Sequence, residues 1–271
     1  MSRIRFTGAA RTWLECLPLG DGRLGAMTDG GVSSTTIHLN DATAWSGSPS
    51  SESTGSMPDA AASADLLSAA RSAVAAGDPT AAEAPLQAMQ TRYAQSFVPM
   101  GDVKIIVEAG DATALPAREL DLRTGIHRSG ADAIRTTTFI ESEQSVLVHV
   151  IEPALPVRLV LSSPLRGPRS DAPVVASPDA ATTALLLRLP SDVAPGHEPD
   201  LPGALWSQAP GSAVEGAIAT RVITDATRTV VLVTTATTFA GVGRMPTGSA
   251  ADALDDAVTR LDAAATPALT S

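Results

Sequence analysis

The feature that most constrains the fold is a long succession of short segments with β-branched or alternating residues, separated by glycine- and proline-containing breaks. Such segments are typical of β-strands, and such breaks are typical of turns. In the second part of the chain, the segments that we expect to be strands are 102–108, 118–122, 133–140, 145–152, 157–162, 184–189, 217–224 and 229–235. So many short strands with so few helical stretches predict a mainly β protein, a large antiparallel β-sandwich.

The first forty residues continue this pattern. Glycine breaks fall at Gly8, at 20–22 and at 30–31, and residues 35–39 alternate between polar and apolar. We expect short strands between these breaks. Later in the chain, the proline-rich stretch 190–210 predicts a long loop.

A helical insertion is predicted at about 58–93. Pro58 suits the opening turn of a helix that stops at Gly77. A second helix begins near Pro79 and continues through Tyr93, with two short pieces or a kink expected at Pro85 because proline removes a backbone donor.

A last helix is predicted from Ser249 to about residue 264. Ser249 is placed to cap its N-terminus, and Asp252 follows three residues later. Leu254, Val258 and Leu261 form its apolar stripe.

The composition excludes some classes of partner. The formal net charge of -10 argues against nucleic acid, whose binding needs clustered cations, and against anionic lipid. A neutral glycan is not repelled by such a surface. Aromatic residues make up only 3% of the chain, so the core must be built mainly from aliphatic side chains.

Cys16 is the only cysteine, so the chain can form no intrachain disulfide. Residues 1–10 lack the apolar run of a signal peptide, and no stretch approaches the ~20 apolar residues of a membrane span. We therefore expect a cytoplasmic protein with no membrane partner, and no motif indicates a cofactor.

No local motif indicates a metal site or a nucleophilic triad. His38, His127, His149 and His197 have no second ligand at metal-binding spacing, and Gly-x-Ser-x-Gly is missing. Residues 20–25 have Gly-x-Gly-x-x-Gly spacing, but no helix follows them to offer its N-terminus to a phosphate. We therefore interpret 20–25 as a turn between strands.

Carboxylates and tryptophans remain as candidates for glycan chemistry. A glycosidase needs two carboxylates across a pocket. The candidates by type are Glu15, Asp21, Asp29, Asp41, Glu119 and Asp121, and spacing selects no pair among them. The three tryptophans, Trp13, Trp45 and Trp206, offer flat faces on which sugar rings stack. Burial in the core is the favoured alternative for Trp13 and Trp45, whereas Trp206 is open to both interpretations.

Five blocks of sequence stand out in order along the chain. Residues 13–27 carry Trp and then Leu-Pro-Leu-Gly-Asp-Gly-Arg-Leu-Gly-Ala-Met, and the other blocks are 37–49, 98–103, 118–125 and 231–239. Together these blocks resemble the N-terminal region of the glycoside hydrolase family 95 α-L-fucosidases, and residues 13–27 are similar to the opening of that family. Asp21 stands where the family usually has Asn, and 41–44 depart from the family's second block.

The resemblance implies a β-super-sandwich, here residues 1–245, that packs against a helical (α/α)6 barrel. In the family that barrel carries the general-acid Glu and the residues that activate water, and the reaction inverts the anomeric centre. Residues 249–271 resemble the start of the linker toward the barrel. No catalytic residue of the family has a counterpart in this chain.

The resemblance also suggests a role for Asp21, Arg23, Asn40, Asp41 and Trp45 at the barrel interface or in substrate binding, because polar loops at domain junctions often complete sugar pockets. The alternative is that they only build the sandwich, with glycines setting turns, Asn40 bonding backbone and Trp45 filling the core.

Three functions follow for the whole chain. The first is a non-catalytic domain or fragment of an inverting α-L-fucosidase-type hydrolase that acts on fucosylated glycans. The second is a free-standing carbohydrate-binding module, and the third is a small complete hydrolase. A fragment should expose a large apolar patch, whereas a binding module should show a discrete aromatic cleft.

Overall fold

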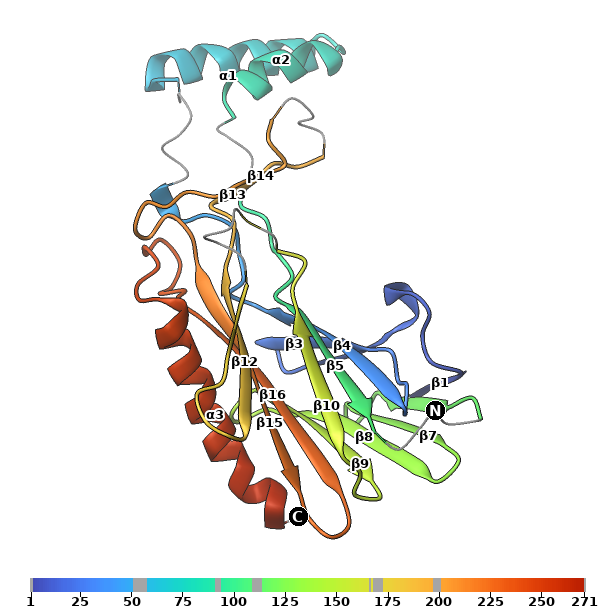
Figure 1. Ribbon diagram of the computed structural model, residues 1–271. Coiled ribbons are helices and arrows are strands. Elements are labelled where there is room, and N and C mark those ends of the chain that lie inside the picture. The colour runs from blue at the N-terminus through green and yellow to red at the C-terminus, as the bar shows by residue number, and fades with distance from the viewer. Residues whose placement is uncertain are drawn as a thin grey trace.

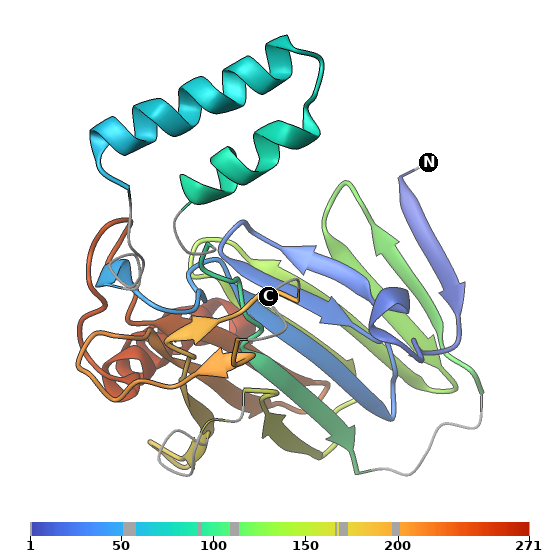
Figure 2. The ribbon, with the colours of Figure 1, turned by 90° about the horizontal axis from the view of Figure 1, so that it is seen from above.

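The structure is a computed structural model that describes residues 2–50, 58–90, 94–108, 114–165, 167, 173–196 and 201–270. Most of its strands form two antiparallel sheets that face each other (Figures 1 and 2). The prediction of a mainly β protein with antiparallel sheets is confirmed.

The larger sheet has nine strands. Their order is β1 (Arg3–Thr7), β6 (Ala117–Asp121), β7 (Ile126–Ala131), β8 (Ile134–Glu141), β9 (Val146–Glu152), β16 (Thr229–Thr237), β15 (Glu215–Thr224), β12 (Thr182–Arg188) and β11 (Val174–Ala176). The smaller sheet has five strands, in the order β10 (Val157–Ser162), β5 (Gly101–Val107), β4 (Ser34–Asp41), β3 (Leu24–Thr28) and β2 (Leu17–Gly20). A short 3-10 helix, η1 (Trp13–Glu15), precedes β2.

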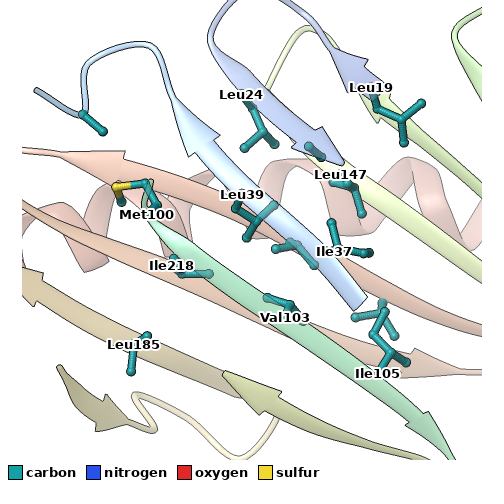
Figure 3. Close-up of a cluster of buried hydrophobic side chains, with 14 of the residues drawn as sticks. Leu19, Leu24, Ile37, Leu39, Met100, Val103, Ile105, Leu147, Leu185 and Ile218 are labelled. Atoms are coloured by element: carbon teal, nitrogen blue, oxygen red, sulfur yellow. The ribbon is translucent and has the colours of Figure 1, made fainter. Parts of the chain in front are cut away.

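An aliphatic core fills the space between the two sheets. Figure 3 shows Ile37 and Val103 from the smaller sheet in one cluster with Leu147 and Ile218 from the larger sheet. Burial alternates along the whole of β4, so every second side chain points inward. This inward series begins at Thr35, continues through Ile37 and Leu39, and ends on Asp41, a buried carboxylate.

A second core lies on the opposite face of the larger sheet, under the C-terminal helix α3 (Ala250–Thr270) (Figure 1). Leu254 and Leu261 are buried there, and Val258 packs at the edge, as the predicted stripe required. Ser249 and Asp252 form the predicted cap, since the Ser249 N–H donates to Asp252 Oδ2 at 2.7 Å.

The helical insertion consists of α1 (Ala60–Ala75), the 3-10 helix η3 (Thr80–Ala82) and α2 (Glu83–Ala88). Asp59 caps α1 by accepting a bond from the Ala62 amide at 2.8 Å. The expected break lies before α2, so Pro85 falls in its first turn, where a missing N–H costs no bond. The helices stand away from both sheets in Figures 1 and 2. Tyr93 lies outside the described residues.

The loop expected at 190–210 contains secondary structure. Strands β13 (Asp192–Val193) and β14 (Ala204–Leu205) pair with each other as a small separate ladder. Trp206 follows β14 and is half-buried against the core between the sheets.

Candidate functional site

The turn between β2 and β3 is held by Asp21. Its Oδ1 accepts bonds from the backbone amides of Arg23 and Leu24, each at 2.8 Å. Gly22 has a φ of +96°, a conformation that side chains other than glycine rarely adopt. The turn therefore presents the Arg23 side chain in a defined direction.

The Asp21 carboxyl is held in its charged form. Burial raises its pKa. Hydrogen bonds from the Ser145 hydroxyl and from the amides of Arg23 and Leu24 lower the pKa by more than burial raises it, so that it lies below its usual value. An asparagine side chain would accept the same two amide bonds. The geometry of Asp21 is that of a turn-forming residue.

Arg23 connects this turn to both sheets. Its Nη2 donates to Asp41 Oδ2 at 2.9 Å and to the backbone carbonyl of Thr235 at 2.8 Å. Its Nη1 is buried and has no hydrogen-bond partner among the described residues.

Asp41, at the end of β4, is fully buried and accepts four bonds. Besides Arg23, its Oδ2 accepts the Thr235 hydroxyl at 2.7 Å. Its Oδ1 accepts the Thr43 amide at 3.0 Å and the Thr43 hydroxyl at 2.6 Å. The Thr43 hydroxyl also lies 2.6 Å from that of Thr237. Asp41 is thus a satisfied buried acceptor that joins β4 to β16.

Arg260 of α3 contacts the same carbonyl. Its Nη1 donates to the Thr235 backbone oxygen at 2.9 Å. Burial, and secondarily the positive charge of Arg23, lower the pKa of Arg260. Val233 is the last residue of β16 that pairs with β9. Two guanidinium groups therefore converge on the part of β16 that follows Val233.

An aromatic surface lies beside this network. The Trp45 indole N–H donates to the Ala42 carbonyl at 3.0 Å, and its ring packs against Phe97 with centroids 5.3 Å apart. Trp45 is 41% exposed and Phe97 is 47% exposed. The expectation that Trp45 and Trp13 are core residues is wrong, since Trp13 is 56% exposed. Trp13 is the first residue of η1, and Trp45 follows the turn after β4, so neither lies in the interior of a strand.

A cavity of about 310 Å³ adjoins Trp45. Its walls combine the 45–49 loop with the loop that follows β16 and include Gln95, Phe239, Val242 and Arg244. Aromatic and apolar walls with a few polar groups are typical of small-molecule sites.

Asn40 lies in a shallow hollow next to this cavity, with Gly20, Gly22, Arg23 and Phe97. Its side-chain amide donates to the Val98 carbonyl at 3.4 Å, as the alternative interpretation expected. The structure thus brings Asp21, Arg23, Asn40, Asp41 and Trp45 into one region. Their role in binding stays a prediction.

The sequence analysis missed four other residues of this region, because only the fold brings their distant segments together. They are Thr43, Thr235, Phe239 and Arg260.

The remaining candidate carboxylates are occupied elsewhere. Glu119 and Asp121 bond Arg3 on the outer face of the larger sheet. Glu15 accepts the Arg11 amide at 2.7 Å, and Asp29 accepts the amides of Gly31 and Thr36 at 3.0 Å. Each has a local structural partner.

Two of the four histidines, His127 and His149, are buried, and the sequence did not predict that they lie in one row. His127 on β7 and His149 on β9 flank Thr138 on β8 in one cross-strand row. His149 Nδ1 lies 2.9 Å from the Thr138 hydroxyl, whereas His127 has no hydrogen-bond partner among the described residues. Burial lowers the pKa of His127 to about 4, helped by Arg118, and lowers that of His149 to about 3, helped by His127. Both rings are therefore neutral at pH 7.

No metal centre emerges from the part of the chain that the structure describes, because no three His, Cys, Asp or Glu side chains gather there. His38 Nδ1 lies 2.7 Å from Asp102 Oδ1, and His197 falls outside the described residues. None of the helices described has the length and apolar character of a membrane span.

Comparison with known proteins identifies the family. A family model described as "Glycosyl hydrolase family 65, N-terminal domain" matches residues 4–241. The chain is also 32% identical to Alpha-L-fucosidase 2 of Arabidopsis thaliana over 129 residues, which are 46% of this chain and 14% of that protein. The matched part is therefore a small share of the relative's length. Because the family model spans most of the chain, this protein belongs to the family of glycosyl hydrolase family 65 N-terminal domains.

Proposed function

We propose that this chain is the non-catalytic N-terminal domain of an inverting α-L-fucosidase-type glycoside hydrolase that acts on fucosylated glycans. The observation that carries the proposal is the 32% identity to Alpha-L-fucosidase 2 of Arabidopsis thaliana, within a chain of the glycosyl hydrolase N-terminal family. The partner of this domain is a helical (α/α)6 barrel that supplies the catalytic residues.

The arrangement of the carboxylates supports a non-catalytic role. Glycosidases of either stereochemistry place two carboxyl groups across a pocket, about 5–9.5 Å apart. Asp21 and Asp41 are the two candidates nearest the aromatic cavity. Asp21 accepts backbone hydrogen bonds within a turn, and Asp41 accepts the hydrogen bonds of a buried network. Neither is free to protonate a leaving group or to activate water.

We place the barrel interface at the surface formed by Arg23, Asn40, Trp45 and Phe97. Trp45 and Phe97 expose aromatic faces there, and the Arg23–Asp41 bond fixes the turn beside them. Exposed aromatic side chains with nearby polar groups suit either a domain contact or the edge of a sugar pocket. The pocket is completed only when the barrel is present.

A free-standing carbohydrate-binding module is the second candidate. It is favoured by the cavity that Trp45, Phe239 and Val242 line, because an aromatic cleft is what such a module needs. In that function the cavity holds a sugar without help from another domain.

A fluorescence titration separates the two. The 271-residue chain is titrated with L-fucose and with 2′-fucosyllactose up to millimolar concentration, and tryptophan emission is followed. The domain proposal predicts no saturable change. Saturable binding that Trp45→Ala abolishes and Trp206→Phe leaves intact would contradict it and support the binding module.

A further inference from the structure

The cavity beside Trp45 is built from four separate segments of the chain. Residues 45–49, after β4, form one side, and the 239–246 loop between β16 and α3 forms the other (Figures 1 and 2). Gln95 and Val214 complete the lining. The volume of about 310 Å³ is at the small end of the range for small-molecule sites, so the cavity suits a ligand of about one or two sugar residues.

Glycines set the backbone on both sides of this cavity. On the loop side, Gly241 and Gly243 have φ values of +115° and +70°, and the Gly241 carbonyl accepts the Arg244 amide at 3.2 Å. On the other side, Gly47 has a φ of +72°, and its amide donates to the Pro190 carbonyl at 2.9 Å. Side chains other than glycine rarely adopt such φ values, so the sequence specifies this backbone course.

Arg244 is the only charged residue among the described residues that line the cavity. The stem of its side chain lies over Gly241, because a Cβ atom added at Gly241 would be 3.6 Å from Arg244 Cδ. Within the described part of the chain, its guanidinium group has no ion pair and no hydrogen bond. A free guanidinium group in a lining without a carboxylate favours an anionic ligand.

Gln95 adds a second donor. Its Oε1 accepts the Ser46 hydroxyl at 3.2 Å, and Ser46 Oγ in turn accepts the Ser96 amide at 2.9 Å. The Gln95 amide oxygen is therefore already bonded, whereas its Nε2 has no partner among the residues that the structure describes. Arg244 and Gln95 thus both offer N–H groups to a ligand, and a carboxylate has two oxygens that can accept them.

Apolar side chains form much of the remaining lining. Val214 is buried, whereas Phe239 is 37% exposed and Val242 is 96% exposed. A small inorganic anion makes no use of such walls, but the C–H groups of a pyranose pack against them. Because the chain belongs to a family of glycosyl hydrolase N-terminal domains, a sugar is favoured over other organic acids as the body that bears the carboxylate.

We propose that this cavity binds a hexuronic acid residue, with its carboxylate held by Arg244 and Gln95 and its ring against Phe239. The guanidinium fork donates paired hydrogen bonds to a carboxylate, and the CH₂OH group of a neutral hexose offers only one oxygen. The inference rests on the function proposed above for the choice of a sugar. It adds that the fucosylated glycan carries a uronic acid, which Arg244 distinguishes from a neutral hexose.

An NMR titration of the ¹⁵N-labelled 271-residue chain tests the proposal. The probes are the methyl glycosides of D-glucuronic acid and D-galacturonic acid, each compared with the matching neutral hexoside, from which it differs only at C6. At least one uronide should shift the amide signals of Gly47, Gly241 and Gly243 saturably. Its Kd should be at least about tenfold lower than that of the neutral hexoside, because only the uronide makes charge-assisted bonds.

Variants locate the carboxylate. Arg244→Gln should raise the Kd of the uronide to that of the neutral hexoside, whose own Kd should stay unchanged. Arg244→Lys keeps the charge without the fork, so its uronide Kd should be intermediate. Gln95→Glu puts a like charge beside the ligand and should weaken uronide binding alone. Arg128→Gln, which changes an exposed arginine on β7, is the matched control and should leave every Kd unchanged.

Three results would overturn the proposal. They are no saturable shift with either uronide, equal Kd values for a uronide and its neutral hexoside, and an Arg244→Gln variant that still prefers the uronide. Benzoate is added as a carboxylate on a ring that is not a sugar, and a benzoate Kd as low as that of the uronides would also contradict a sugar site. Thermal melting of each variant checks that the fold is intact.

The proposed hydrolase role is tested by different measurements. Saturable binding of L-fucose would count against the non-catalytic domain and would leave the difference between uronide and hexoside as it is. Conversely, a cavity that does not distinguish uronides would remove this inference and leave the domain proposal unchanged. The two failures can therefore be told apart.

Discussion

Arg23 Nη2 lies 2.9 Å from Asp41 Oδ2, and this bond ties the β2–β3 turn to the end of β4. The same two side chains also reach Thr235 on β16 of the other sheet. One ion pair therefore fastens the two sheets together beside the Trp45 surface. Stability and the geometry of the candidate site depend on the same contact.

Asp41→Ala should lower the free energy of unfolding by about 3 kcal/mol, because it leaves the Arg23 guanidinium without its buried partner. That value is at the low end for buried pairs, since the Arg23 side chain is 28% exposed. Urea denaturation at pH 7 measures it. Asp65→Ala, on the exposed surface of α1, is the control and should stay within about 0.5 kcal/mol of the wild type. A similar small loss for Asp41→Ala would show that the pair contributes little.

The two glycines of the β2–β3 turn should differ. Gly22→Ala should destabilise the fold by about 1–2 kcal/mol, because the φ of +96° is costly for any side chain. Gly20→Ala should be nearly neutral, since Gly20 has an ordinary φ and an added Cβ would meet only the Leu24 carbonyl, at 3.5 Å. The sequence pattern alone suggested that both glycines are needed. Thermal melting of the two variants decides, and equal losses would contradict the turn geometry.

Stability should fall in acid because of the buried histidines. Their folded pKa values, about 4 for His127 and about 3 for His149, lie below the ordinary value of 6.5. The unfolded chain therefore takes up protons first, so the stabilisation is complete above pH 6.5 and is lost as the pH falls below it. At pH 5 the loss is about 2 kcal/mol for each histidine.

Urea denaturation between pH 7.5 and 5 measures this slope. His149→Gln should flatten it, whatever that variant does to stability at pH 7. His38→Gln is the control, since His38 is only half-buried and lies beside Asp102. A slope unchanged by His149→Gln would mean that His149 is not the group that titrates.

Trp45→Ala should cost about 1–2 kcal/mol, less than the loss for a fully buried tryptophan. What is removed is one hydrogen bond to the Ala42 carbonyl and the packing against Phe97. Trp45→Phe keeps the aromatic pair and should recover about half of the loss. Calorimetric melting measures both variants, and a loss above about 3 kcal/mol for Trp45→Ala would show that the ring is buried in solution.

Local pattern was enough to predict much of the fold. The alternation at 35–39 correctly predicted a strand, which is part of β4. The Ser249 cap and the apolar stripe with its two leucines correctly predicted the helix α3. Strand β7 was missed because its sequence, Ile-His-Arg-Ser-Gly-Ala, has little apolar alternation. It is a strand because it pairs with β6 on one side and β8 on the other. The residue pattern within a single segment cannot predict such pairing.

The candidate site was predictable only in part, for the same reason. Arg23 and Asp41 stood out within their motifs, but Thr235 is 194 residues from Asp41 in sequence. The histidine row depends on the register of three strands. Trp45 was misplaced because an aromatic residue after a strand resembles a core residue until the surrounding loops are known.

The central claim, that this chain supports catalysis without performing it, is tested most directly by an assay of hydrolysis. The 271-residue chain is incubated at high protein concentration with p-nitrophenyl α-L-fucoside, and release of p-nitrophenol is compared with a buffer blank. The account predicts no release above the blank. Sustained turnover that one carboxylate substitution abolishes, while the fold stays intact, would contradict it and show that this chain is a complete hydrolase.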